Sequence, residues 1–194
     1  MFFTRLTPNF NDWKQPSGWD GKCKSSNPKK PNYEDTHGFG WEEWLFEEYH
    51  NHLSDPEFDC KGFVEAYNKE DVSKEKIDRL YLYTKVCENK LNVFSGCYYV
   101  GHIDNVIPIP PESKNSQQVK TALNAVGITE NKFEDMVDSA LNITFKVKDV
   151  HVCFAKVFTR PLDLKGYKFD YQFHLVKLEE YPKFTKEISK YSNH

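Results

Sequence analysis

The chain has 194 residues, of which 39% are hydrophobic and 28% charged, a composition typical of a globular domain rather than a disordered chain. No apolar run approaches the roughly 20 residues that a membrane-spanning helix needs, and the first residues lack the charged-then-apolar order of a signal peptide. We therefore expect one cytoplasmic domain over residues 1–194, with no membrane association.

The net charge of −3 is unevenly distributed along the chain. Residues 1–32 carry six Lys or Arg and two Asp, whereas residues 33–60 carry nine acidic side chains and no Lys or Arg. Such segregation marks a binding face, or it reflects two segments that neutralise each other across a contact. The sequence leaves both interpretations open.

Residues 1–32 are predicted to form a proline-rich arm of irregular structure, interrupted by Phe10, Trp13 and Trp19. Because disordered tails seldom contain such large apolar side chains, we expect an ordered arm or a long loop. Basic and aromatic residues alternate over residues 13–22, WKQPSGWDGK. Aromatic faces stack on bases and lysines neutralise phosphates, so this stretch favours nucleic-acid binding.

Residues 37–49, HGFGWEEWLFEEY, predict a glycine-containing loop followed by an amphipathic helix that begins at Trp41. One side of this helix is expected to carry Trp41, Trp44, Leu45 and Glu48. The other side is expected to carry the acids Glu42, Glu43 and Glu47. The stretch either anchors the core alone or also forms a wall of a binding pocket.

Further along the chain, alternating apolar and polar residues predict a series of strands. The segments are Gly62–Tyr67, Leu80–Val86, Val93–Ile109, Ile143–Val147, Val150–Phe158 and Tyr171–Leu178. We expect the fourth and fifth to form a hairpin that turns near Lys148 and Asp149. Gly96 and Gly101 inside the third predict bulges or bends, as at the corners of a small barrel.

Helical spacing predicts a pair of helices within residues 112–140 and a short helix within the polar tail, residues 181–194. Together with the strands, these segments predict an α+β fold, a small bent β-barrel with an early helix and an inserted helical pair.

Three short motifs resemble the PUA-like superfamily, which includes the EVE, YTH, ASCH and SRA domains. The GWDG sequence at residues 18–21 is similar to an element of EVE domains, and Gly62–Val64 begins a strand of the GF(V) type. Residues 99–103, YVGHI, resemble a strand of such barrels. The GFGWEEW sequence at residues 38–44 is similar to a segment of domains attached to modification-dependent restriction enzymes.

This resemblance implies a PUA-like, EVE-like barrel that reads a modified or flipped base in an aromatic pocket. The implied partner is nucleic acid, with modified DNA favoured over RNA, in a restriction-modification or defence context where a nuclease is a candidate partner. The candidate base-binding residues are Trp13, Trp19, Asp20, His37, Phe39 and Trp41. The candidate backbone-binding residues are Lys14, Lys22, Lys24, Lys29, Lys30, Lys165 and Lys168. For each tryptophan the alternative is a core anchor, and for each lysine it is a solvated surface side chain.

Enzymatic motifs are missing from the sequence, which contains no P-loop, HExxH or GxSxG pattern and no convincing PD-(D/E)xK pattern. We assign no catalytic residue, metal ion or cofactor on this basis. His102 and Asp104 share one strand face and His151 lies on another strand, so a metal or proton-transfer site stays open. Cys97 or Cys153 becomes a candidate nucleophile only if the fold brings a histidine to it.

The five cysteines, Cys23, Cys60, Cys87, Cys97 and Cys153, include no CxxC pair. We expect reduced and mostly buried thiols. Two alternatives to a base reader stay open. One is a protein-interaction module that uses the acidic residues 33–60, as a DNA mimic or a phage or defence factor. The other is a small hydrolase of ASCH type.

Overall fold

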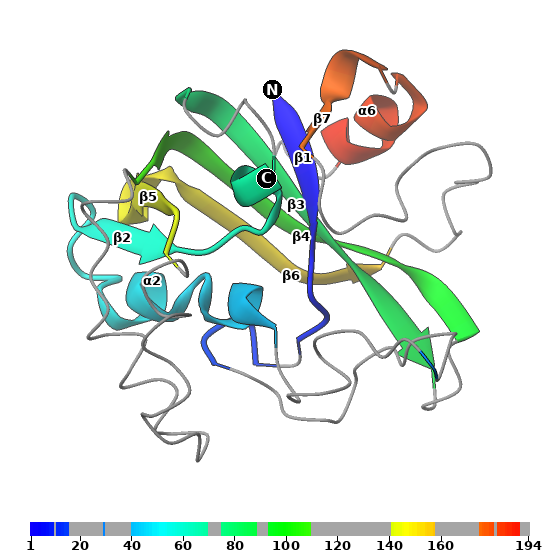
Figure 1. The fold of residues 1–194 in the computed structure, drawn as a ribbon, viewed down its shortest axis with the longest axis horizontal. Helices are drawn as coiled ribbons and strands as arrows, with labels where there is room; N and C mark the ends of the chain where they lie inside the picture. The colour runs from blue at the N-terminus through cyan, green and yellow to red at the C-terminus, as the bar shows by residue number, and fades with distance from the viewer. Residues whose placement is uncertain are drawn as a thin grey trace.

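The computed structural model describes residues 1–9, 11–15, 29, 40–69, 75–88, 93–109, 141–157, 175–180 and 182–190. These residues form an α+β fold around one curved mixed sheet (Figure 1). Its strands are β1 (Phe2–Leu6), β2 (Asp59–Gly62), β3 (Ile77–Glu88), β4 (Val93–Pro108), β5 (Ile143–Lys146), β6 (Val150–Val157) and β7 (Val176–Lys177). The α-helices are α2 (Glu47–Asn51), α3 (Ala66–Lys69) and α6 (Pro182–Ser189). The 3-10 helices are η1 (Trp41–Trp44), η5 (Val147–Asp149) and η6 (Leu178–Glu180).

Strands β3 and β4 form the long antiparallel centre of the sheet, which confirms two of the predicted strands. Both glycines expected to mark irregularities lie at shifts in this pairing. Leu82 pairs with Gly101 and Tyr83 with Tyr99, so Val100 is an extra residue in β4. A second shift lies beside Gly96. These bulges bend the pair, as the sequence predicted.

Strand β1 was not expected, because the prolines of the arm suggested irregular structure. It pairs in parallel with β3 and antiparallel with β7, so it lies inside the sheet. Phe3 and Leu6 are fully buried in it. The predicted arm therefore begins with a strand of the core.

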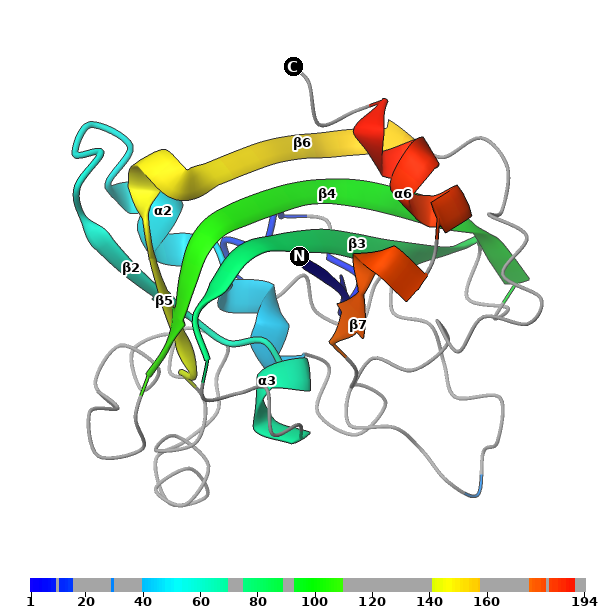
Figure 2. The ribbon, with the colours of Figure 1, turned by 90° about the horizontal axis from the view of Figure 1, so that it is seen from above.

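The predicted hairpin between β5 and β6 is wrong. Both strands instead pair antiparallel with β4, β6 alongside Tyr98–Ile103 and β5 alongside Ile107–Pro108. The 3-10 helix η5 separates them, and β5 continues into a pairing with β2. Figure 2 shows β3 and β4 bending at one end of the sheet, where β5 runs beside the end of β4 and diverges from β6.

The expected barrel is not closed within the residues that the structure describes. Strands β2 and β7 end the path β2-β5-β4-β3-β1-β7, and no pairing joins these two edges in the described ranges. The α+β class is confirmed, and the sheet is strongly curved (Figure 2). The inserted helical pair, predicted within residues 112–140, lies outside the described residues.

The predicted strand Gly62–Tyr67 is wrong, because a distant side chain takes the backbone hydrogen bonds of Val64. Strand β2 ends at Gly62, and both backbone groups of Val64 bond the Asn142 side chain instead of another strand. The Val64 N–H donates to Asn142 Oδ1 at 2.9 Å, and Asn142 Nδ2 donates to the Val64 carbonyl at 2.8 Å. Helix α3 follows directly.

The helix expected from Trp41 onward divides into the 3-10 helix η1 and the short helix α2. Trp44, Leu45 and Phe46 are buried, and the last two join Leu80 and Ile103 in the hydrophobic core. The short tail helix is confirmed as α6. Of the last predicted strand, residues 171–174 lie outside the described residues and the remainder forms only β7 and the start of η6. No described helix is long and apolar enough to cross a membrane.

Candidate functional site

Strand β3 presents two chemically different faces. Leu80 and Leu82 belong to the hydrophobic core, so Arg79, Tyr81 and Tyr83 lie on the opposite face. We call this second face the polar face, because it carries charged, hydroxyl and imidazole groups. It continues onto β4 through three cross-strand pairs, Arg79 with Asp104, Tyr81 with His102 and Tyr83 with Tyr99. His151 on β6 pairs with His102 and extends this face onto a third strand.

Gly101 fixes the spacing of this polar face. Its φ of 150° is one that other residues rarely adopt. A Cβ atom there would lie 2.2 Å from the His151 carbonyl oxygen, far inside a normal contact. The glycine therefore allows β4 and β6 to approach closely just before His102.

His102 is a buried imidazole, 5% exposed, held between aromatic neighbours. Its Nδ1 lies 2.9 Å from the Tyr99 hydroxyl, and its ring stacks on His151 with centroids 4.5 Å apart. Burial, with a smaller contribution from the positive charge of Arg79, lowers the pKa of His102 to about 4. Burial likewise raises the pKa of Tyr99. At neutral pH the site therefore holds a neutral imidazole bonded to a protonated phenol.

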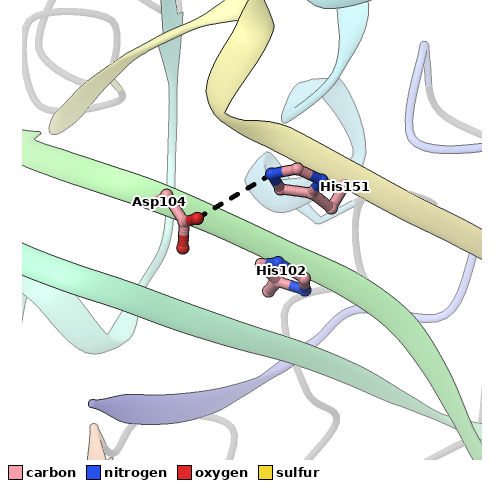
Figure 3. Close-up of side chains that lie close together, drawn as sticks. All are labelled: His102, Asp104 and His151. Carbon is pink, nitrogen blue, oxygen red and sulfur yellow. Dashed lines mark ion pairs between the residues drawn. The ribbon is translucent and has the colours of Figure 1, made fainter. Parts of the chain in front are cut away.

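Asp104 is fixed by a two-pronged ion pair across the strands. Arg79 donates from Nε to Oδ1 at 2.6 Å and from a terminal nitrogen to Oδ2 at 2.9 Å. Burial alone would raise the pKa of Asp104, but the hydrogen bonds and charge of Arg79 outweigh it and the pKa is lowered. His151 Nε2 lies 3.8 Å from Asp104 Oδ2, and its side chain is 49% exposed (Figure 3).

These three side chains come together from two strands, with one donor atom of each within 4.8 Å of the others. We call His102, Asp104 and His151 the His-Asp-His cluster. Figure 3 shows the Asp104 carboxylate and the His151 ring facing each other, with the His102 ring beneath. Two imidazoles and a carboxylate can hold a transition metal or transfer a proton. The sequence had placed His102 and Asp104 on one face, but only the β4–β6 pairing adds His151.

Of the candidate base-binding residues, Trp13 is in the core. It is 5% exposed, and its indole Nε1 donates to the Thr7 carbonyl at 3.0 Å. Trp13 also accepts a backbone hydrogen bond from Phe46 at 2.9 Å. Trp13 is therefore a core anchor, which was the alternative to base binding.

The other candidates are only partly covered by the described residues. Lys14 is half-exposed and lies 3.7 Å from Asp12, Lys29 is exposed, and the backbone of Trp41 begins η1. The side chain of Trp41 lies outside the described residues. So do Trp19, Asp20, Lys22, Lys24, Lys30, His37, Phe39, Lys165 and Lys168.

No protein-family model matches the chain, and no match was found among curated proteins or solved structures. The resemblance to the PUA-like superfamily therefore stays a prediction.

Sequence reasoning missed two buried glutamates. Glu42 is 1% exposed and Glu43 is fully buried, although both were expected on the outer side of a helix. Glu42 accepts the Thr7 N–H at 2.7 Å and the Glu65 N–H at 3.0 Å. Burial raises the pKa of Glu42 to about 8. Their local sequence signal was a pair of acids flanked on both sides by tryptophan.

Glu43 and Asn9 fasten two distant parts of the chain together. Glu43 accepts the Gly40 N–H and the Asn9 side-chain amide, each at 2.8 Å. The same Asn9 amide nitrogen donates to the Gln15 carbonyl at 2.8 Å. Asn9 Oδ1 accepts the backbone N–H of Trp13 at 3.0 Å. We call Asn9 and Glu43 the arm clamp, since they bind residues on both sides of the segment 16–39.

The acidic segment 33–60 is neutralised in part, but by a partner that the sequence did not suggest. Glu57 pairs with Lys148 at 2.6 Å and with Lys146 at 3.2 Å, and Asp59 lies 3.7 Å from Lys146. These lysines belong to β5 and η5 rather than to the arm. With Glu42 and Glu43 buried as well, fewer acids are left for an acidic binding face.

Two described cysteines are free thiols. Cys60 is buried as expected, and burial raises its pKa to about 12. Cys153 is only half-buried. A thiol with the raised pKa of Cys60 is a poor nucleophile at neutral pH. The remaining three cysteine side chains lie outside the described residues.

Proposed function

We propose that the chain is a nucleic-acid-binding domain that holds one modified or flipped base, with modified DNA favoured over RNA. We further propose that the curved α+β sheet is a PUA-like fold. The domain would act in restriction or defence, with a nuclease as its partner. The described residues are compatible with it through their strongly curved sheet with short helices.

The observation that carries the proposal is the arm clamp. Gln15 and Gly40, the residues on either side of the segment 16–39, bond the same pair, Asn9 and Glu43. Binding residues concentrate on loops whose ends a rigid scaffold holds. The segment between these ends has the composition of such a loop, because it combines aromatic residues with lysines.

In this proposal the aromatic residues of the segment stack on the base, and its polar residues read the base edge. Trp19 and Phe39 provide stacking faces, and Asp20 and His37 provide edge contacts. Trp13 acts from the core by positioning the start of the segment, through its bond with Phe46. The phosphate contacts come from the candidate lysines, which are Lys14, Lys22, Lys24, Lys29, Lys30, Lys165 and Lys168.

A salt titration tests the phosphate contacts. Binding of a fluorescent duplex is measured by anisotropy at several salt concentrations, for the wild type and for the double variant Lys22→Gln/Lys24→Gln. Each lost phosphate contact reduces the slope of log affinity against log salt by about 0.9, so the double variant is expected to lose roughly 2 units of slope.

The matched control is Lys148→Gln, which removes an exposed lysine that pairs with Glu57. It is expected to leave both the affinity and the salt slope unchanged. An equal loss of affinity per removed lysine in the control and in the double variant would mean that binding depends on net charge alone. No binding of duplex or single-stranded nucleic acid by the wild type would refute the proposal.

A further inference from the structure

We infer that the His-Asp-His cluster binds one divalent metal ion of the zinc class. This inference is independent of nucleic-acid binding, because its three ligands lie on β4 and β6 and none is a candidate nucleic-acid contact. The three donor atoms already lie within 4.8 Å of one another, and His151 Nε2 lies 3.8 Å from Asp104 Oδ2. Zinc holds its nitrogen and oxygen ligands at about 2 Å in a tetrahedral arrangement, which places two ligand atoms roughly 3.3 Å apart, so the donor atoms need to close by about 0.5 to 1.5 Å. Rotation of the half-exposed His151 ring can supply that movement.

The scaffold of the cluster is a sheet rather than a loop, which suits a site with fixed geometry. His102 and Asp104 are two residues apart on β4 and therefore point to the same side. His151 is the direct cross-strand partner of His102. Gly101 allows the close approach of the two strands that brings the two imidazoles together. Because the rings are stacked with an interplanar angle of 20°, the exposed His151 ring has to rotate out of the stack before both rings can direct a nitrogen at one ion.

Hydrogen bonds around the cluster are those that commonly orient metal ligands. The Tyr99 hydroxyl lies 2.9 Å from His102 Nδ1 and can fix the orientation of that ring. Arg79 fixes the plane of the Asp104 carboxylate through its two hydrogen bonds. Each carboxylate oxygen has two lone pairs, so one pair on an oxygen remains for a metal beside Arg79.

The charge of Arg79 sets a limit on the affinity. A guanidinium next to the carboxylate repels a cation, so an ion held by charge alone is disfavoured here. Imidazole nitrogen is instead preferred by zinc, cobalt, nickel and copper, whereas magnesium and calcium prefer oxygen. The cluster should therefore bind zinc or cobalt and reject magnesium. Three protein ligands leave a fourth position for water or an external donor.

Cobalt is the direct probe, because Co²⁺ in a site of low coordination number has strong visible absorption bands. The metal-free full chain is titrated with Co²⁺, and the bound cobalt is then displaced by Zn²⁺. We expect visible bands that saturate at one equivalent, are lost on adding zinc and are unchanged by excess magnesium.

The variant His151→Ala tests the assignment, and its side chain is exposed enough for the fold to persist, which circular dichroism verifies. We expect a loss of at least tenfold in cobalt affinity, with partial recovery in His151→Cys, which restores a ligand. The matched control His52→Ala removes an imidazole that stacks on Phe58 outside the cluster and should bind cobalt as the wild type does.

Three results would overturn the inference. The first is the absence of visible bands and of zinc binding in the wild type. The second is unchanged affinity in a folded His151→Ala variant. The third is a thiolate-to-cobalt charge-transfer band in the wild type, which would place the metal on cysteines instead.

Discussion

The Glu42 carboxyl group is buried against two backbone N–H donors, and its ionisation is opposed by burial. Its folded-state pKa of about 8 lies above the ordinary value of 4.5, so folding takes up a proton between these pH values. The stability that Glu42 contributes is therefore complete below about pH 4.5 and is lost as the pH rises through about 8.

We expect Glu42→Gln to remove this pH dependence and to lower the free energy of unfolding by about 1–3 kcal/mol in acid, because the amide cannot accept both N–H groups. Urea unfolding at about pH 5 and about pH 9 measures the free energy of unfolding of the wild type and of the variant. The difference between these two free energies should become smaller as the pH rises. A gap that is constant with pH would contradict the raised pKa of Glu42.

Gly101 is the residue on which the close approach of β4 and β6 depends. We expect Gly101→Ala to lower the free energy of unfolding by about 2–4 kcal/mol, because it combines backbone strain with a clash against the His151 carbonyl. Chemical denaturation measures the loss.

The control for this variant is Gly62→Ala, where the added Cβ would meet the end of the Leu45 side chain 2.6 Å away. Leu45 is buried, but the end of its side chain can shift at a lower cost than the backbone of β6, which cannot move without breaking its pairing. The control should therefore lose less stability. Equal losses in both variants would show that the strand approach at Gly101 is not the constraint.

At the scale of elements, alternation of apolar and polar residues was sufficient to predict β3, β4 and β6, which are long and have one face in the core. It failed for the stretch after Gly62, where the alternation is present but Asn142 takes the backbone bonds of Val64. Helical spacing failed for Glu42, because a 3-10 helix forms there and the carboxylate is buried against partners far along the chain, Thr7 and Glu65. Such partners are invisible to any local pattern.

The arm clamp joins the two ends of the segment 16–39, to which the proposed function assigns base binding. We expect Asn9→Ala to lower the free energy of unfolding by about 1–2 kcal/mol, since it removes hydrogen bonds to Gln15, Trp13 and Glu43. It should also weaken duplex binding, because both ends of the segment 16–39 lose a shared anchor. Urea unfolding and anisotropy measure the two effects.

Asn51→Ala is the control for the clamp, because Asn51 is exposed at the end of α2. It should change stability by no more than about 0.5 kcal/mol and leave binding unaffected. If Asn9→Ala is destabilised but binds the duplex with wild-type affinity, the clamp is not needed for nucleic-acid binding.

At the scale of the whole molecule, the α+β class was predictable from the alternation of strand-like and helix-like segments. The topology was not, because the register of β5 and β6 against β4 depends on long-range pairing rather than on a local turn. The His-Asp-His cluster was predictable only in part for the same reason. Two of its members are neighbours in sequence, and the third joins them only through the pairing of β4 with β6.

A binding titration with base-specific ligands shows directly whether this chain reads a modified base. Short duplexes carrying cytosine, 5-methylcytosine, 5-hydroxymethylcytosine or N6-methyladenine, and a single-stranded RNA, are titrated against the full chain while its tryptophan fluorescence is recorded. We expect one modification to bind at least tenfold more tightly than its unmodified duplex, with quenching that is lost in Trp19→Phe. Equal affinity for all ligands, or no binding to any of them, would contradict the claim that this chain reads a modified base.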